Sequence, residues 1–145
     1  LAKFICDKFK LNLKQIRYYN AVPDIKDNKN TYYNHIEFLD KLRKDNIFVK
    51  TRKLKYIKKL KTKIEKGVDV LIASDMIKKT LVKKECQVCI LISGDADFIP
   101  VMEIIKASKN EVITCSVING YARELLQGKF RYLILTKEDL DKCLK

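Results

Sequence analysis

Two aspartates, Asp95 and Asp97, come directly after an apolar run, VCILI, and a Ser-Gly turn. The run predicts a buried strand over residues 88–93. In an open α/β sheet, ligands bind in the crevice beyond the carboxyl ends of the strands. Carboxylate oxygens are the ligands that Mg²⁺ and Mn²⁺ prefer in proteins. Asp95 and Asp97 are therefore predicted to bind a divalent cation at this turn.

A third carboxylate, Asp69, lies near the start of a helix predicted over residues 68–84. It shares a helix face with Ile72 and Met76, and this face is expected to point toward the sheet. Asp69 could therefore be a further ligand of the cation. Asp75 is a weaker candidate, because six residues correspond to about 240° of net rotation around a regular helix.

Each of these carboxylates also has a simpler interpretation. Asp97 could cap the helix predicted to begin at Phe98, since Asp is a favoured capping residue. Asp69 could stabilise its own helix by lying at the positive end of the helix dipole. Asp95 has a weaker alternative of this kind, because it precedes the expected cap and follows a glycine turn. The residue types alone leave both interpretations open.

The chain is strongly basic, with 31 Lys and Arg residues against 18 Asp and Glu and a net charge of +13. Residues 41–66 hold twelve Lys and Arg and only two acids. Such a stretch could follow a phosphate backbone, with Tyr56 stacking on a base, although a solvated lysine-rich surface explains it equally well. An acidic metal pocket in a basic protein suggests a phosphodiester substrate. The predicted substrate-binding residues are Ser93, Lys50, Arg52, Lys53, Lys55 and Lys66.

Length and composition limit the class of protein. A chain of 145 residues with 47% hydrophobic residues is expected to form one globular domain. Its apolar runs are far shorter than the roughly 18 residues that cross a bilayer, so no transmembrane segment is predicted. The five cysteines are odd in number and scattered, which favours reduced thiols in a cytoplasmic protein. Cys86 and Cys89 have C-x-x-C spacing, but no second pair follows and the single His35 is distant, which argues against structural zinc.

Helical and strand patterns alternate along the chain, which predicts a mostly parallel sheet with helices on both faces. The charged segment that follows the strand 47–53 and ends at Lys63 is expected to form an extended arm or a hairpin. Thr136 begins a terminal helix with a capping pattern. The other predicted helices cover residues 1–9, 31–44, 68–84, from 98 onward, and 122–128, and the strands 14–20, 47–53, 88–93, 112–117 and 132–135.

Two sequence elements together resemble the NYN domain, the LabA-like branch of the PIN-like nucleases: KGVDVLIASDM from Lys66 and SGDADFIPV from Ser93. RYYNAVP from Arg17 and RKLKY from Arg52 match the second and third strand regions of that family in order. The resemblance covers nearly the whole chain. It implies a three-layer α/β/α Rossmann-like fold and a metal-dependent ribonuclease that uses Mg²⁺ or Mn²⁺.

By this resemblance, Asp69, Asp95 and Asp97 match the family's acidic cluster, and Asp75 matches a recurrent aspartate. The family pattern begins with a strand that ends in an Asp-Gly-x-Asn-like motif and supplies another ligand. This chain begins at the helix that follows, so the resemblance implies one domain, residues 1–145, without its first strand.

The leading hypothesis is an endoribonuclease that cuts single-stranded RNA. Asp69 and Asp95 would be primary ligands, Asp97 would bind directly or through water, and Ser93 would contact water or phosphate. One alternative is an RNA-binding or regulatory module with a degraded site. Another is a phosphohydrolase that acts on small nucleotides. A homodimer is compatible with each of them.

Overall fold

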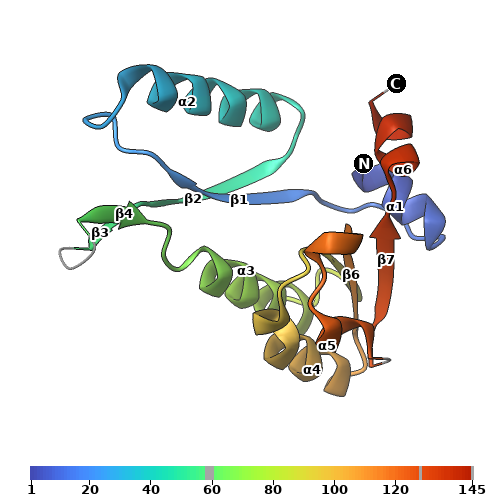
Figure 1. The fold of residues 1–145 in the computed structure, drawn as a ribbon. Coiled ribbons are helices and arrows are strands. Elements are labelled where there is room, and N and C mark those ends of the chain that lie inside the picture. Colours follow the sequence, from blue (N-terminus) through green and yellow to red (C-terminus); the bar gives the residue numbers. More distant parts are fainter. Residues whose placement is uncertain (58–60, 128, 145) are drawn as a thin grey trace. The chain divides into compact units, whose positions relative to one another are not determined.

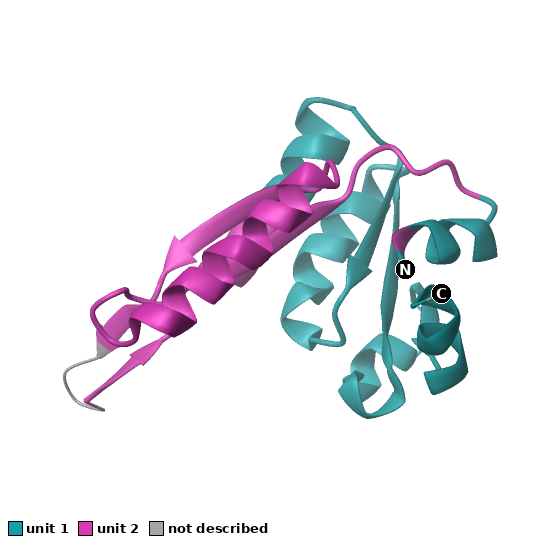
Figure 2. Ribbon diagram, turned by 90° about the horizontal axis from the view of Figure 1, so that it is seen from above, with its two compact units in different colours: residues 1, 3–10, 73–145 teal, residues 2, 11–72 magenta. Residues whose placement is uncertain are grey.

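The computed structural model describes residues 1–57, 61–127 and 129–144. By its internal contacts the chain divides into two compact units (Figure 2). Unit 1 comprises residues 1, 3–10 and 73–145, and unit 2 comprises residues 2 and 11–72. The expectation of one domain over residues 1–145 stays a prediction.

Unit 2 is built on a parallel strand pair joined by a helix (Figure 1). Strands β1 (Arg17–Val22) and β2 (Phe48–Lys53) pair in parallel, and α2 (Lys29–Lys44) connects them. The helix begins at Asn28, whose side chain accepts a hydrogen bond from a backbone N–H of the first turn. Leu39 lies on the buried face of α2 and is fully inaccessible. The unit therefore has the strand–helix–strand arrangement expected for a parallel pair.

A short antiparallel hairpin follows β2. It consists of β3 (Lys55–Ile57) and β4 (Thr62–Ile64). The Lys63 ammonium lies 2.9 Å from a carboxylate oxygen of Asp24 and 2.6 Å from one of Asp27. Both aspartates belong to the loop after β1, so this lysine fixes the hairpin to that loop. Of the two forms expected for the segment, the hairpin is the one observed.

Unit 1 contains a three-stranded parallel sheet in the order β5-β6-β7. Its strands are β5 (Val88–Ile92), β6 (Glu111–Val117) and β7 (Arg131–Leu135). The helix α4 (Ile99–Ala107) connects β5 to β6 and packs on β6. Four consecutive residues of β6, from Val112 to Cys115, are buried, so both faces of this central strand are covered.

The helices at the two ends of the chain contact each other within unit 1. They are α1 (Ala2–Lys8) and α6 (Lys137–Cys143), which lie side by side in Figure 1. The Lys8 ammonium lies 4.0 Å from a carboxylate oxygen of Asp139. The expected cap of α6 is confirmed: Thr136 and Asp139 form a reciprocal capping box. The remaining elements are α3 (Val68–Ile77), a π-helical turn (Lys78–Val82), 3₁₀ turns at Ala96–Phe98 and Ile118–Gly120, and α5 (Arg123–Leu126).

The predicted fold class is confirmed. Helices and strands alternate, and every pairing in the described part of the chain is parallel except the β3–β4 hairpin. One element differs from its prediction: the α-helix expected over residues 68–84 ends at Ile77 and continues as a π turn. The Thr80 hydroxyl donates to the carbonyl of Met76 at 2.8 Å and competes with the regular backbone bond, which favours this change.

A half-buried tyrosine links two strands of unit 1 through its hydroxyl. The Tyr121 hydroxyl lies 2.7 Å from the backbone carbonyl of Thr114 in β6 and 3.0 Å from that of Leu133 in β7. Burial raises the pKa of this hydroxyl. We expect Tyr121→Phe to lower the free energy of unfolding by about 1 kcal/mol, because a buried hydrogen bond is lost. Urea unfolding followed by far-ultraviolet circular dichroism measures the change.

The matched control is Tyr132→Phe. The two rings pack edge-on with centroids 6.0 Å apart, and the Tyr132 hydroxyl makes no hydrogen bond within the described residues. The control should therefore unfold at nearly the wild-type urea concentration. Equal losses in the two variants would show that the hydrogen bonds of the Tyr121 hydroxyl contribute no more to stability than the Tyr132 hydroxyl does.

Candidate functional site

Ser93, Asp95 and Asp97 form a compact turn at the carboxyl end of β5. The Ser93 hydroxyl accepts a hydrogen bond from the Asp95 N–H at 3.2 Å. The Asp95 carboxylate accepts one from the Asp97 N–H at 2.9 Å. Both aspartates are exposed. The turn therefore presents two carboxylates to solvent at the edge of the sheet where ligands bind in α/β proteins.

The capping residue of this turn is Asp95, and the alternative in which Asp97 caps the following helix is wrong. Asp95 precedes the 3₁₀ turn Ala96–Phe98 and accepts from the Asp97 N–H through one oxygen, Oδ1. Within the described residues, its second oxygen and both oxygens of Asp97 have no hydrogen-bond or ion-pair partner. Oxygens of this kind suit a hard divalent cation, so the side chains present fit Mg²⁺ or Mn²⁺.

The glycine between Ser93 and Asp95 holds the turn against the loop that follows β6. The Ala122 N–H donates to the Gly94 carbonyl at 2.8 Å. A Cβ atom added to Gly94 would lie 1.6 Å from the carbonyl oxygen of Gly120. The two backbones are thus in direct contact, and the position of both carboxylates depends on this contact.

The burial expected for the two carboxylates of α3 is wrong. Asp69 was expected to face inward but is exposed, whereas Asp75, the weaker candidate, is buried with 5% of its surface accessible. The buried positions of the helix are Val68, Asp75 and Met76, which lie seven and eight residues apart on one side. Asp69 occupies the first turn of α3, where a negative charge is favoured by the helix dipole.

The predicted acidic cluster is divided between the two units. Asp69 belongs to unit 2, whereas Asp95 and Asp97 belong to unit 1. Across residues 1–57, 61–127 and 129–144, no three His, Cys, Asp or Glu side chains are grouped so as to hold a metal ion. A shared site of Asp69, Asp95 and Asp97 therefore stays a prediction.

A basic hollow lies within unit 2 at the carboxyl end of β2. It has a volume of about 700 Å³. Four of the six predicted substrate-binding residues line it, and Lys50 and Ser93 do not. The lining residues are Thr51, Arg52, Lys53, Leu54, Lys55, Lys66 and Gly67. We call this surface the basic hollow.

The β3–β4 hairpin brings Lys66 and Gly67 back to the end of β2. Gly67 has a positive φ of 82°, which glycine adopts at little cost. Sequence inspection missed Gly67 and Thr51 as lining residues, although a glycine directly after Lys66 was a signal for a tight turn. Lys58 and Lys59, which belong to the same basic stretch, lie outside the described residues.

Tyr56 lies outside the basic hollow. It is 52% exposed and pairs with Lys63 across the hairpin, so the two side chains share one face. Because successive residues of a strand point to opposite faces, Lys55 lies on the other face and lines the hollow. The backbone N–H of Lys26, followed by the Lys63 ammonium, lowers the pKa of Asp24 below its usual value. This ion pair stabilises the hairpin face that carries Tyr56.

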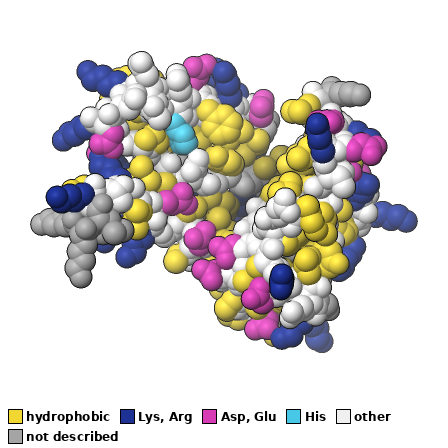
Figure 3. All heavy atoms as spheres, viewed as in Figure 1, with side chains coloured by type: hydrophobic (Ala, Val, Ile, Leu, Met, Phe, Trp, Pro, Cys, Tyr) yellow, Lys and Arg dark blue, Asp and Glu magenta, His cyan; other side chains and the backbone are white. Residues whose placement is uncertain are grey.

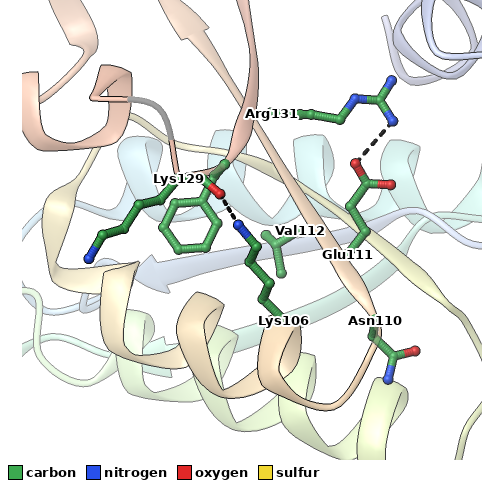
Figure 4. A pocket seen from close by; sticks show the side chains of 7 residues that line it. Lys106, Asn110, Glu111, Val112, Lys129 and Arg131 are labelled. Carbon is green, nitrogen blue, oxygen red and sulfur yellow. Dashed lines mark hydrogen bonds and ion pairs between the residues drawn. The ribbon is translucent and has the colours of Figure 1, made fainter.

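A second hollow, of about 320 Å³, lies in unit 1 at the amino ends of β6 and β7 (Figure 4). Its charged side chains already have partners, and the Lys129 ammonium lies 3.4 Å from Glu103. Arg131 lies 3.0 Å from Glu111, and the Lys106 ammonium donates to the backbone carbonyl of Lys129. The Lys106 ammonium also lies 5.4 Å from the centroid of the Phe130 ring, in a cation–π contact. The charges of this hollow are thus already paired, and it lies at the opposite strand ends from Asp95 and Asp97.

Lys and Arg side chains also lie outside the basic hollow. Lys and Arg side chains are spread over the face of the molecule shown in Figure 3. The basic hollow is therefore distinguished by the convergence of its side chains and not by the number of lysines. In the described part of the chain, no helix has the length and apolar character that a bilayer span requires.

Comparison with known proteins identifies the family. Residues 1–135 match the NYN domain. The crystal structure of a protein of unknown function from Vibrio parahaemolyticus is similar, with a TM-score of 0.63 and 20% sequence identity over 94% of this chain and 77% of that chain. At this identity the likeness shows the fold alone, and no curated protein matches. The family match covers nearly the whole chain and is consistent with the PIN-like superfamily, so the protein belongs to the NYN domain family.

Proposed function

We propose that the protein is a metal-dependent endoribonuclease. The NYN family is generally nuclease-like, and Asp69, Asp95 and Asp97 resemble part of the acidic cluster of that family, whose first aspartate is absent from this chain. The observation that supports the proposal most strongly is the turn after β5, where Asp95 and Asp97 present carboxylate oxygens without a basic partner in the described residues. An RNA phosphodiester, which is anionic, would be attracted to a protein of net charge +13.

In this proposal Asp95 and Asp97 hold Mg²⁺ or Mn²⁺. When bound, the ion supplies Lewis-acid stabilisation of charge at the scissile phosphate. The Ser93 hydroxyl, which accepts from the Asp95 N–H, would use its own proton to contact water or a phosphate oxygen. Asp69 is the proposed third ligand. Asp75 ranks behind it, because a buried side chain is less able to reach a substrate.

We further propose that the basic hollow binds the backbone of single-stranded RNA. Arg52, Lys53, Lys55 and Lys66 converge there, and Arg and Lys side chains contact phosphates without regard to base sequence. Binding at such a surface releases counterions, so the affinity should fall steeply as salt is raised.

A charge-removal variant tests the basic hollow. We expect the triple change Arg52→Gln, Lys55→Gln and Lys66→Gln to weaken binding of a labelled single-stranded RNA at least about 10-fold. The slope of log affinity against log salt should become less steep by about 2, since each lost phosphate contact contributes about 0.7 for a single strand. Fluorescence anisotropy at several salt concentrations measures both quantities.

The control variant removes three positive charges from positions outside the basic hollow. Lys29, Lys44 and Lys137 are exposed and do not line the basic hollow. Changing these three to Gln should have a clearly smaller effect on affinity. An equal loss in both triple variants would show that net charge alone attracts RNA and would remove the hollow from the proposal.

The direct test of the function is cleavage of labelled single-stranded RNA by the purified protein. We expect internal cuts with Mn²⁺ or Mg²⁺ and none with EDTA. Binding without cleavage would favour the second candidate, an RNA-binding or regulatory module. That candidate is supported by the absence of a three-ligand metal cluster among the described residues. Hydrolysis of mononucleotides without cleavage of RNA would instead identify a small-nucleotide phosphohydrolase.

A further inference from the structure

Two cysteines lie in contact at the amino end of β5. The sulfur atoms of Cys86 and Cys89 are 3.9 Å apart. Cys89 belongs to β5 and pairs with Val112 of β6, whereas Cys86 belongs to the loop that precedes the strand. Both thiols are partly accessible, unlike Cys6 and Cys115, which are buried. The proposed nuclease chemistry uses neither Cys86 nor Cys89.

The loop that carries Cys86 is held on both sides of this residue. Before it, the Glu85 N–H donates to the carbonyl of Lys79 at 2.8 Å, and the two side chains form an ion pair. After it, the Gln87 carbonyl accepts from the N–H of Glu111 at 2.9 Å. These contacts keep the Cys86 sulfur beside Cys89, so little conformational freedom has to be lost before the two sulfurs react.

We propose that Cys86 and Cys89 form a two-thiol redox site that hydroperoxides convert to a reversible intramolecular disulfide. A disulfide requires a sulfur–sulfur distance of about 2.05 Å, so the sulfurs must approach by roughly 2 Å. Rotation of the Cys86 side chain, with a small movement of its loop, provides this approach while Cys89 stays in the β5–β6 ladder. The inference is independent of the proposed nuclease activity.

The chemistry balances in two steps. The Cys86 sulfur attacks the hydroperoxide and becomes a sulfenic acid, and the hydroperoxide is reduced to an alcohol or to water. The Cys89 sulfur then attacks the Cys86 sulfur, forms the S–S bond and displaces hydroxide, which leaves as water with the proton of the Cys89 thiol. Burial, followed by the neighbouring Cys86, raises the pKa of Cys89 to about 12. This assigns the first attack to Cys86, because the thiolate is the reactive form.

A metal site explains the pair less well. Thiolate sites for zinc are completed by four ligands. Within the described residues no third His, Cys, Asp or Glu side chain joins these two sulfurs in a group that could hold a metal. The raised pKa of Cys89 also opposes the deprotonation that a metal ligand requires. Disulfide formation needs only the two sulfurs that are present.

The sequence makes the site easy to isolate for the test. Trypsin cuts after Lys84 and Lys106, and the peptide 85–106 contains Cys86 and Cys89 and no other cysteine. We expect hydrogen peroxide treatment of the folded protein, followed by alkylation and digestion, to give this peptide lighter by two hydrogen atoms and without alkyl groups. Dithiothreitol added before alkylation should restore two alkyl groups.

Three variants make the outcome decisive. Cys143→Ser removes another partly accessible thiol and should leave the oxidised 85–106 peptide unchanged. Cys86→Ser and Cys89→Ser should each abolish the loss of two hydrogens. A wild-type peptide that keeps both alkylation sites under conditions that oxidise Cys143 would overturn the proposal. So would a disulfide that joins either residue to Cys6, Cys115 or Cys143 in its place.

Discussion

Asp95→Asn is expected to abolish metal-dependent RNA cleavage while leaving the protein folded. The amide oxygen of Asn can still accept the Asp97 N–H that the Asp95 carboxylate accepts at 2.9 Å, because Asn and Asp are equally good capping residues. The change therefore removes the negative charge and keeps the local structure. Loss of a residue that only supports a metal ligand typically costs roughly 10- to 100-fold in metal affinity or activity. Loss of a direct ligand should cost more than about 100-fold in the cleavage rate.

Three measurements distinguish loss of the metal ligand in Asp95→Asn from loss of the folded structure. Thermal unfolding of Asp95→Asn should match the wild-type curve. RNA affinity in EDTA should be unchanged or higher, because a negative charge has been removed from a surface that faces an anionic substrate. Asp141→Asn, at an exposed aspartate of α6, is the matched control and should cleave at the wild-type rate. Metal-dependent cleavage by Asp95→Asn at the wild-type rate would exclude Asp95 as a ligand.

The strands of unit 1 could be predicted because each is a short apolar run bounded by turn residues. β5 was expected over residues 88–93 and spans Val88–Ile92, and β7 was expected over 132–135 and spans Arg131–Leu135. The helix expected over 122–128 is shorter, Arg123–Leu126, and Gly128 lies outside the described residues. Local patterns therefore identified the elements and their order but not their ends.

β1 shows why the ends could not be predicted. The expected strand covered residues 14–20, but β1 spans Arg17–Val22. Its limits coincide with its pairing to β2, in which Arg17 lies opposite Phe48 and Val22 opposite Lys53. The Arg17 guanidinium also stacks on the Phe48 ring at 4.1 Å. A strand boundary set by a partner about thirty residues away is not contained in the local sequence.

Of the candidate site, too, only the features set by adjacent residues could be predicted. Asp95 and Asp97 could be placed at a strand end from the sequence, because the VCILI run and the Ser-Gly turn are adjacent to them. The capping role of Asp95 could not, because it depends on a 3₁₀ turn that precedes α4. Asp69 shares the side of α3 that carries Met76, as expected, but it is exposed because it lies in the first turn of the helix. Lys66 joins the basic hollow only through the hairpin, which is a contact across the sequence.

Gly94→Ala is expected to destabilise the protein by about 3 kcal/mol or more. The added Cβ would lie 1.6 Å from the Gly120 carbonyl oxygen, 2.4 Å from its carbon and 2.9 Å from the Tyr121 Cα atom. All three are backbone atoms, so no side-chain rotation relieves the overlap. Overpacking alone typically costs 1–3 kcal/mol, and separating the loops also breaks the hydrogen bond from Ala122 to Gly94, worth about 1 kcal/mol. Native domains have about 5–15 kcal/mol of stability, so this variant should lose a large share of it.

Gly67→Ala is the comparison that separates steric overlap from backbone strain as the cause of the destabilisation. Nothing lies within 4 Å of a Cβ at Gly67, but its φ of +82° disfavours any residue with a Cβ. The cost there is conformational, about 1 kcal/mol, and Gly67→Asn should recover part of it because Asn tolerates this region. Gly94→Asn should be no more stable than Gly94→Ala, because any Cβ atom at Gly94 overlaps the backbone of Gly120. Urea unfolding by far-ultraviolet circular dichroism ranks the four variants. Equal midpoints for Gly94→Ala and Gly67→Ala would mean that the loops after β5 and β6 separate easily, and that the turn holding Asp95 and Asp97 is not fixed by this contact.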